Sequence, residues 1–119
     1  MKTRKLRELE VSQGSGSIVN VSSQSGVVGI PGLTKAAALE YAAKGIRINA
    51  LCSGSVHTPM VERALQSHPE AMNEVIRDIP LGRLGHAEEI ASAALWLSSE
   101  GASFVVGQAL VVDGGYTAR

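Results

Sequence analysis

The sequence has little of what marks several large classes of proteins. Its 119 residues contain one cysteine, Cys52, so an internal disulfide is excluded and we expect a reducing compartment, the cytoplasm. No apolar run approaches the roughly 20 residues that cross a bilayer, so a membrane partner is not expected. Aromatic residues make up 3%, and 11 basic residues balance 11 acidic ones. This composition gives no support for a nucleic acid or an anionic membrane as the partner.

What the sequence does contain is an alternation of strand and helix patterns. Periodic apolar residues predict helices over 33–45 and 86–101, and shorter helices are expected between 60 and 78. Residues 1–12 have the pattern of the end of a surface helix. Runs rich in β-branched and apolar residues between turn signals predict three strands, at 17–22, 46–51 and 109–113.

Local signals predict where some of these helices begin and end. Gly45 and Gly101 stand at the ends of the two longer helical patterns, where a left-handed residue closes a helix. Ser67 and Glu70 have the spacing of a capping box around Pro69, which predicts a helix that continues to about residue 78.

Strands that alternate with helices predict βαβ units and a parallel sheet, the α/β class. Three parallel strands are few, because such strands are normally covered on both faces and paired on both edges. We therefore expect residues 1–119 to form a single partial domain. In open α/β sheets the site lies at the carboxyl ends of the strands, which selects the loops 22–32, 53–60 and 113–116.

Several motifs in and near these loops are weak indicators of function. The stretch GVVGIPG at 26–32 lies where a phosphate loop belongs, but it has neither the G-x-G-x-x-G spacing nor the G-K-[ST] ending. Ser55 lies near His57 without a nucleophile elbow. His57, His68 and His86 lack metal-ligand spacing, so no metal site is expected.

Three longer stretches occur in order: GSGSIVNVSS with GVVGIPG, LTKAAALEYAAKGIRINALCSGSVHTPM, and IPLGRLGHAEEIASAALWLSSEGASFVVGQALVVDGGY. Together they resemble the C-terminal half of the classical short-chain dehydrogenase/reductases. The resemblance implies a partial Rossmann-type, doubly wound parallel sheet with flanking helices. It also implies NAD or NADP as cofactor and hydride transfer to or from a small-molecule alcohol or carbonyl substrate.

The resemblance assigns roles to a few residues. The second serine of the pair, Ser23, matches the catalytic serine that polarises the substrate oxygen, and Ser22 is more simply structural. The loop that includes Gly54 matches the family's nicotinamide loop. There the backbone at Val56 and the hydroxyl of Thr58 would hold the carboxamide.

Two features near this site qualify the resemblance. Ser53 stands where the family usually has proline, which loosens a rigid turn. Asp113-Gly114-Gly115 fits the family's closing D-G-G and is expected to be architectural.

The partner of the catalytic serine is missing. In the family, a tyrosine about 13 residues after the serine is the general acid/base and a lysine four further on supports it; here those positions hold Ala36 and Glu40. Tyr41 and Lys44 have a spacing of three, and their flanks match the end of the helix instead. The direct junction of Gly32 and Leu33 indicates that about a dozen residues, roughly three helical turns, are absent.

Three hypotheses follow. The chain is an oxidoreductase of this family with negligible turnover, because the catalytic pair and the glycine-rich cofactor loop are absent. Alternatively it is a non-catalytic interaction protein whose helices at 1–12 and 86–98 and last strand dock on a full-length relative, or which forms a homo-oligomer. Or it is a partial or mis-joined copy of a complete enzyme. The stretch 61–80 occupies the family's substrate lid, and neither the substrate nor the choice between NAD and NADP can be read from these residues.

Overall fold

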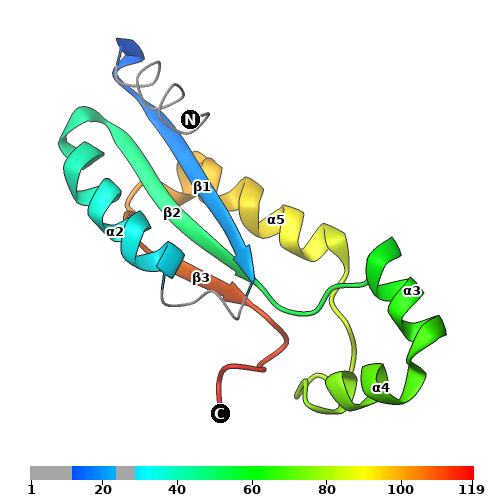
Figure 1. Cartoon of the computed structure of the whole chain (residues 1–119). Coiled ribbons are helices and arrows are strands. Elements are labelled where there is room, and N and C mark those ends of the chain that lie inside the picture. The colour runs from blue at the N-terminus through cyan, green and yellow to red at the C-terminus, as the bar shows by residue number, and fades with distance from the viewer. Residues whose placement is uncertain (1–11, 24–28) are drawn as a thin grey trace.

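The computed structural model describes residues 12–23 and 29–119. Within them, three strands form one parallel sheet in the order β1-β2-β3 (Figure 1). The strands are β1 (Gly16–Ser23), β2 (Ile46–Ser53) and β3 (Ala109–Val112). The predicted α/β class and parallel sheet are therefore confirmed, and all three strands fall where the sequence places them. The expectation for the first eleven residues lies outside the described part of the chain.

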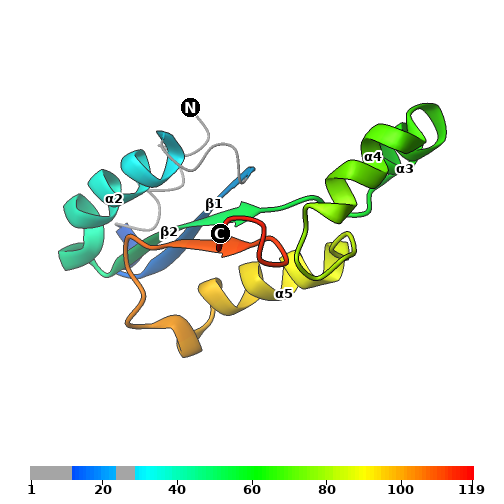
Figure 2. The same ribbon diagram turned by 90° about the horizontal axis from the view of Figure 1, so that it is seen from below.

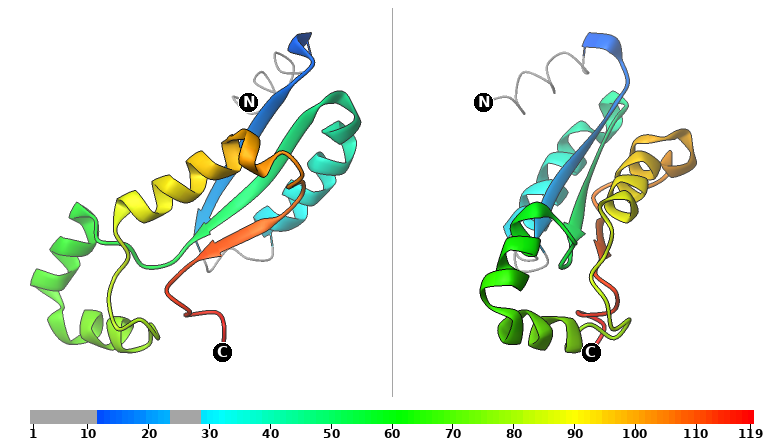
Figure 3. Two further views of the ribbon diagram at one scale, coloured as in Figure 1. Left: turned by 180° about the vertical axis from the view of Figure 1, so that it is seen from behind. Right: turned by 90° about the vertical axis from the view of Figure 1, so that its right-hand side faces the viewer.

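Helices cover the two faces of the sheet. Helix α2 (Gly29–Tyr41) lies on one face and α5 (Ala87–Ser98) on the other (Figures 2 and 3). Spacings of three and four residues along α2 bring its buried side chains, Pro31, Thr34 and Ala38, onto one side. The methyl group of Ala38 packs in a buried cluster with two isoleucines of β2. This two-sided cover is the layered arrangement that the alternating pattern predicts.

The central strand β2 is the most buried element. Residues 48–52 are all buried, as Ile46 is, because neighbouring strands and helices cover both faces. Cys52 is among them and is a free, buried thiol, as expected of a small hydrophobic side chain. By contrast β1 lies at one edge of the described sheet, and its Val21 is 62% exposed.

The connection from α2 to β2 ends as the sequence predicts. A short 3-10 turn, η2 (Ala42–Lys44), follows α2, and Gly45 closes it with a φ of 79°, a conformation that favours glycine. The start of α2 was predicted at Leu33 and lies four residues earlier, at Gly29. The glycines at 29 and 32 were interpreted as loop residues, but the helix accommodates both in its first turn.

Two short helices, α3 (Pro59–Ser67) and α4 (Pro69–Arg77), pack on each other and extend from the carboxyl ends of the strands (Figure 1). The predicted capping box at Ser67 is wrong, because that hydroxyl donates to the Arg63 carbonyl at 2.9 Å. His68 occupies the N-cap position of α4.

The molecule is elongated. Its radius of gyration is 16.3 Å, whereas a compact domain of this length has about 13–14 Å. In the described residues, no helix combines the length and the apolar character needed to cross a membrane.

Helix α5 carries the predicted apolar stripe, with Leu97 buried and Ile90 and Ala94 half-buried. It ends at Ser98, earlier than the predicted Gly101, and a 3-10 turn, η3 (Glu100–Ala102), follows. The Arg47 guanidinium explains this earlier end. It donates to the carbonyls of Leu97 at 2.8 Å and Ser99 at 3.2 Å, which are free at a helix C-terminus.

Candidate functional site

The carboxyl ends of β1 and β2 bring the predicted catalytic serine beside residues 53–60. These residues are the predicted nicotinamide loop, and the name cofactor loop refers to them. Ser23 and Ser53 are register partners at the ends of these neighbouring strands. The Ser23 residue is exposed, and Ser22, which donates its hydroxyl to the Ser23 carbonyl at 3.3 Å, is half-buried. The sheet therefore places Ser23 at the edge where α/β proteins bind their ligands.

The cofactor loop begins with two hydrogen bonds that hold its first turn. Gly54 donates its backbone N–H to the Val112 carbonyl of β3 at 2.9 Å. The Ser53 hydroxyl donates to the Gly54 carbonyl at 3.0 Å. Serine at this position thus provides a hydrogen bond where the family's proline would restrict the backbone.

Val56 is held by its neighbours and not by its own backbone groups. It forms an isolated parallel bridge with Gly85. Gly85 donates to the Ser55 carbonyl at 3.0 Å and accepts from the His57 N–H at 2.8 Å. In this pattern the N–H and C=O of the central residue point the other way. Within the described residues those two groups of Val56 have no hydrogen-bond partner, so they can bind a ligand.

Thr58 caps helix α3. Its hydroxyl oxygen accepts the N–H of Val61 at 3.3 Å, and Pro59 follows at the first helical position. A hydroxyl that accepts a hydrogen bond still has its own proton to donate. The predicted contact with a carboxamide is compatible with this cap.

A second segment, residues 79–86, contacts this loop through the Val56–Gly85 bridge and is held to α5 by an ion pair. Arg83 donates two hydrogen bonds to the Glu89 carboxylate, at 3.0 and 2.9 Å, and Glu89 also accepts the His86 backbone N–H at 2.7 Å. The hydrogen bond from Arg83, followed by the one from His86, lowers the pKa of Glu89 from 4.5 to about 2. The carboxylate is therefore ionised at neutral pH.

The turn after β3 uses the Asp113 carboxylate for its own structure. Asp113 accepts from the backbone N–H of Gly115 at 2.9 Å, and from the N–H and hydroxyl of Thr117 at 2.9 and 2.7 Å. Desolvation raises its pKa, but these hydrogen bonds outweigh that effect and the net pKa is lowered. A carboxylate with this many donors is suited to holding a turn and not to proton transfer.

A small pocket lies between these loops. Its volume is about 100 Å³, far below the several hundred Å³ of a typical cofactor site. Side chains from the cofactor loop, the 79–86 segment and the β3 turn line it, among them Val56, Arg83, Glu89 and Asp113. This pocket is therefore too small to enclose a cofactor.

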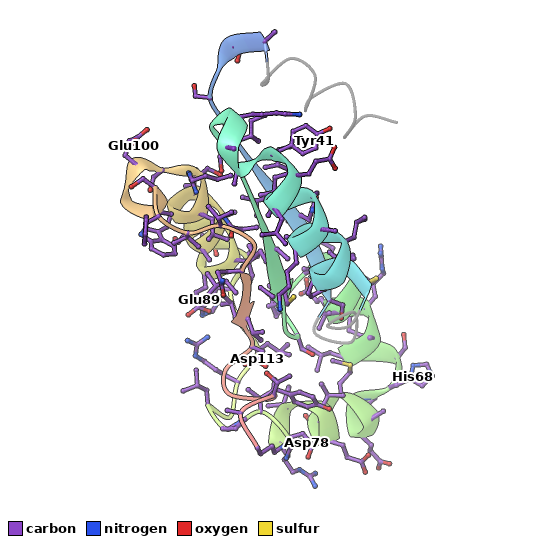
Figure 4. The ribbon with its side chains drawn as sticks, turned by 90° about the vertical axis from the view of Figure 1, so that its left-hand side faces the viewer. Tyr41, His68, Asp78, Glu89, Glu100 and Asp113 are labelled. Carbon is purple, nitrogen blue, oxygen red and sulfur yellow. The ribbon has the colours of Figure 1, made fainter. Side chains whose placement is uncertain are left out.

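Tyr41 and Lys44 lie at the opposite end of the sheet from Ser23. The Lys44 ammonium is 4.8 Å from the Tyr41 ring centroid, in the connection that leads into the first residue of β2. Figure 4 shows Tyr41 near the top of the view and Asp113, which follows β3, well below it. Because β1 is 8 residues long, about 25 Å separates the amino ends of the strands, where Tyr41 and Lys44 lie, from their carboxyl ends, where Ser23 lies. The geometry separates this tyrosine–lysine pair from the predicted catalytic serine.

No cluster of three or more histidine, cysteine, aspartate or glutamate side chains that could hold a metal occurs in residues 12–23 and 29–119. His57, His68 and His86 belong to different segments, the last two at the starts of α4 and α5.

Comparison with known proteins identifies the family. A family model described as Enoyl-(Acyl carrier protein) reductase matches residues 3–117. A 2,5-dichloro-2,5-cyclohexadiene-1,4-diol dehydrogenase of Sphingobium indicum is 44% identical over 117 residues, which cover 87% of this chain and 46% of the relative. A cyclohexanol dehydrogenase of Acinetobacter sp. is 42% identical over 122 residues, with 92% and 46% covered. The chain belongs to the short-chain dehydrogenase/reductase family.

Solved structures agree. A protein from Agrobacterium tumefaciens with bound NADP superposes with a TM-score of 0.89 at 39% identity, over 98% of this chain and 53% of that one. One from Beutenbergia cavernae, also with NADP, gives 0.90 at 35% identity, with 98% and 52% covered. The chain spans about half the length of the relatives it matches.

The alignments also bear on the missing helix. The match to the Sphingobium indicum enzyme runs over 117 positions but takes in 87% of the 119 residues. Within the matched stretch, about a dozen positions of that relative thus have no counterpart here, the number that an absent Tyr-x-x-x-Lys block would leave.

Proposed function

We propose that this chain is part of an NAD(P)-dependent oxidoreductase that acts on a small-molecule alcohol or carbonyl compound in the cytoplasm. The observation that carries the proposal is the register pairing of Ser23 with Ser53. It sets the serine that would bind the substrate oxygen beside the loop that would bind the nicotinamide. When bound, the cofactor supplies or accepts the hydride.

The residues present are complementary to the nicotinamide end of that cofactor. The Val56 backbone groups face away from the Gly85 bridge, and the Thr58 hydroxyl retains a proton. A carboxamide has one acceptor oxygen and two donor hydrogens, so these groups are complementary to it. Gly54, fixed to β3, sets the direction of the loop.

The tyrosine and lysine that would transfer the proton are absent from their expected positions in this chain. The positions expected to hold the tyrosine and lysine are Ala36 and Glu40, and Tyr41 lies at the far edge of the sheet. Loss of a positioned general acid/base costs about 10²–10⁴-fold in rate. We therefore expect the 119-residue chain to have no measurable turnover, and the activity to belong to a chain that contains the absent helix.

The test is an assay of the purified chain with NADH and NADPH against cyclic ketones, and with NAD and NADP against the corresponding alcohols. We expect no substrate-dependent change in absorbance, for the parent and equally for Ser23→Ala. Turnover that Ser23→Ala abolishes and the matched Ser22→Ala retains would overturn the prediction of inactivity. Sequencing the transcript across the codons for Gly32 and Leu33 then establishes whether a longer product carries the Tyr-x-x-x-Lys helix.

A second function, non-catalytic self-association into a homo-oligomer, is favoured by exposed apolar groups. Phe104 is 100% exposed and Trp96 is 47% exposed, while Val21 projects from an edge strand. An uncharged edge strand favours pairing with another chain. Light scattering that finds a monodisperse monomer at micromolar concentration would exclude this function.

A further inference from the structure

The Arg83–Glu89 ion pair encloses the residue that holds the cofactor loop. Glu89 lies in the first turn of α5, and its carboxylate accepts from Arg83 and from the His86 N–H. Arg83 also donates to the Leu84 carbonyl at 3.0 Å. These bonds fix the chain on both sides of Gly85.

Gly85 is also the point of contact with the cofactor loop. A Cβ built on Gly85 would lie 3.5 Å from a Val56 methyl group and 3.7 Å from a Glu89 carboxylate oxygen. Gly85 is therefore enclosed between the ion pair and Val56. Its N–H and C=O make the two hydrogen bonds that orient the backbone of the loop, to Ser55 and from His57.

We propose that Arg83 and Glu89 are positioning residues, which fix the backbone of Val56 for cofactor binding by holding Gly85 in place. The proposal rests on the proposed function for the role of Val56. Neither side chain needs to touch the cofactor. Their effect passes through the two hydrogen bonds that Gly85 makes with the loop.

The pair has the geometry for a local role. Its side chains are 47% and 42% exposed, and an exposed pair contributes little to global stability. Two parallel N–H···O bonds nevertheless fix orientation better than a single contact. Loss of the pair should therefore loosen residues 83–86 and the bridge without unfolding the sheet.

The experiment is amide hydrogen exchange, followed by NMR, on the full 119-residue chain. Arg83→Lys keeps the charge but loses the two-pronged contact, and Glu89→Gln removes the charge. Glu88→Gln is the matched control. Glu88 is an exposed neighbour whose side chain makes no hydrogen bond or ion pair with the described residues. The amides that report on the bridge are those of His57 and Gly85, and the Leu51 amide in β2 reports on global opening.

We expect both bridge amides to exchange about threefold faster, or more, in the two variants, with the Leu51 amide and the Glu88→Gln control unchanged. Unchanged bridge amides overturn the proposal. An equal acceleration of all three amides also overturns it, because the pair is then a general stabiliser.

If a variant does not fold, the parent chain itself gives the answer. Salt at about 1 M reduces the screening length to about 3 Å and weakens an exposed pair. The bridge amides should then exchange faster while Leu51 is unaffected, and an identical response of all three contradicts the proposal. Exchange requires neither cofactor nor turnover, so failure of the proposed function would appear separately, as a transcript that encodes no Tyr-x-x-x-Lys helix and no glycine-rich N-terminal half.

Discussion

Asn49 holds Gln108 in place across the core. The Gln108 backbone N–H donates to the Asn49 side-chain oxygen at 2.9 Å, and the Asn49 amide donates to the Val105 carbonyl at 2.9 Å. Asn49 is fully buried in the central strand. One side chain thus satisfies two backbone groups of the irregular segment that leads into β3. The same segment also bonds the backbone of β2, through Gly107 to Ile48 and from Ala50 to Gln108.

Replacing this side chain should be costly. Asn49→Ala removes the partner of two part-buried backbone groups, so we expect the free energy of unfolding to fall by about 1–3 kcal/mol. Urea denaturation followed by circular dichroism measures the change. Asn73→Ala, on the exposed surface of α4, is the control and should change stability by less than about 0.5 kcal/mol. Equal effects of the two substitutions would contradict this role.

The strands and most helix ends could be predicted from local signals. β-branched runs give the strands, and Gly45 closes its helix because only a residue that adopts a positive φ without strain suits that position. Asn49 was not predicted to be structural. In the predicted strand it is one of two polar residues, with Arg47, and the strand pattern does not indicate what either side chain contacts. Its partners lie more than 50 residues away, and no local pattern indicates contacts at that distance.

Gly114 is the position in the D-G-G turn where a side chain cannot be accommodated. Its φ is 64°, and a Cβ there would come within 2.7 Å of an Ile79 methyl group. We expect Gly114→Ala to lower the free energy of unfolding by about 2 kcal/mol, from left-handed strain and overpacking together. Gly32→Ala is the opposite case, because this glycine lies within α2 and its Cβ would meet nothing within 4 Å. It should raise stability by up to about 1 kcal/mol. Thermal melts that rank the two in the reverse order would refute this interpretation.

The pH dependence of stability should carry a signature of Glu89. Its pKa is lowered from 4.5 to about 2 by the hydrogen bonds from Arg83 and His86. A group with a lowered pKa stabilises the fold above its unfolded value, and that contribution is lost as the pH falls from 4.5 toward 2. Glu89→Gln should therefore flatten the decline in stability over this window, by a modest amount because the group is exposed. Identical parent and variant curves between these pH values would show that the pair contributes nothing.

The candidate site could be predicted only in part. The rule that ligands bind at the carboxyl ends of parallel strands selects the loops that contain Ser23, Val56 and Thr58, and the fold brings these loops to one edge. The Arg83–Glu89 pair and its contact with the loop through Gly85 were not predicted. Arg83 and Glu89 are six residues apart across a helix start, outside the spacings of three and four that identify pairs on one helix. Their target is nearly thirty residues away and is reached through a glycine that has no side chain.

Thr58 should show two separable roles. As the N-cap of α3 its hydroxyl oxygen accepts the Val61 N–H, and loss of such a cap costs about 1 kcal/mol. Because α3 packs mainly on α4 and not on the sheet, we expect Thr58→Val to speed amide exchange in the first turn of α3 and to leave β2 unaffected. Thr58→Ser keeps the hydroxyl and should preserve the cap. In a longer chain that contains the cofactor-binding half, the hydroxyl should also donate to the nicotinamide carboxamide, so Thr58→Val should weaken NADP binding more than Thr58→Ser. A cap that is kept in Thr58→Val and lost in Thr58→Ser would show that the methyl group, and not the hydroxyl, starts the helix.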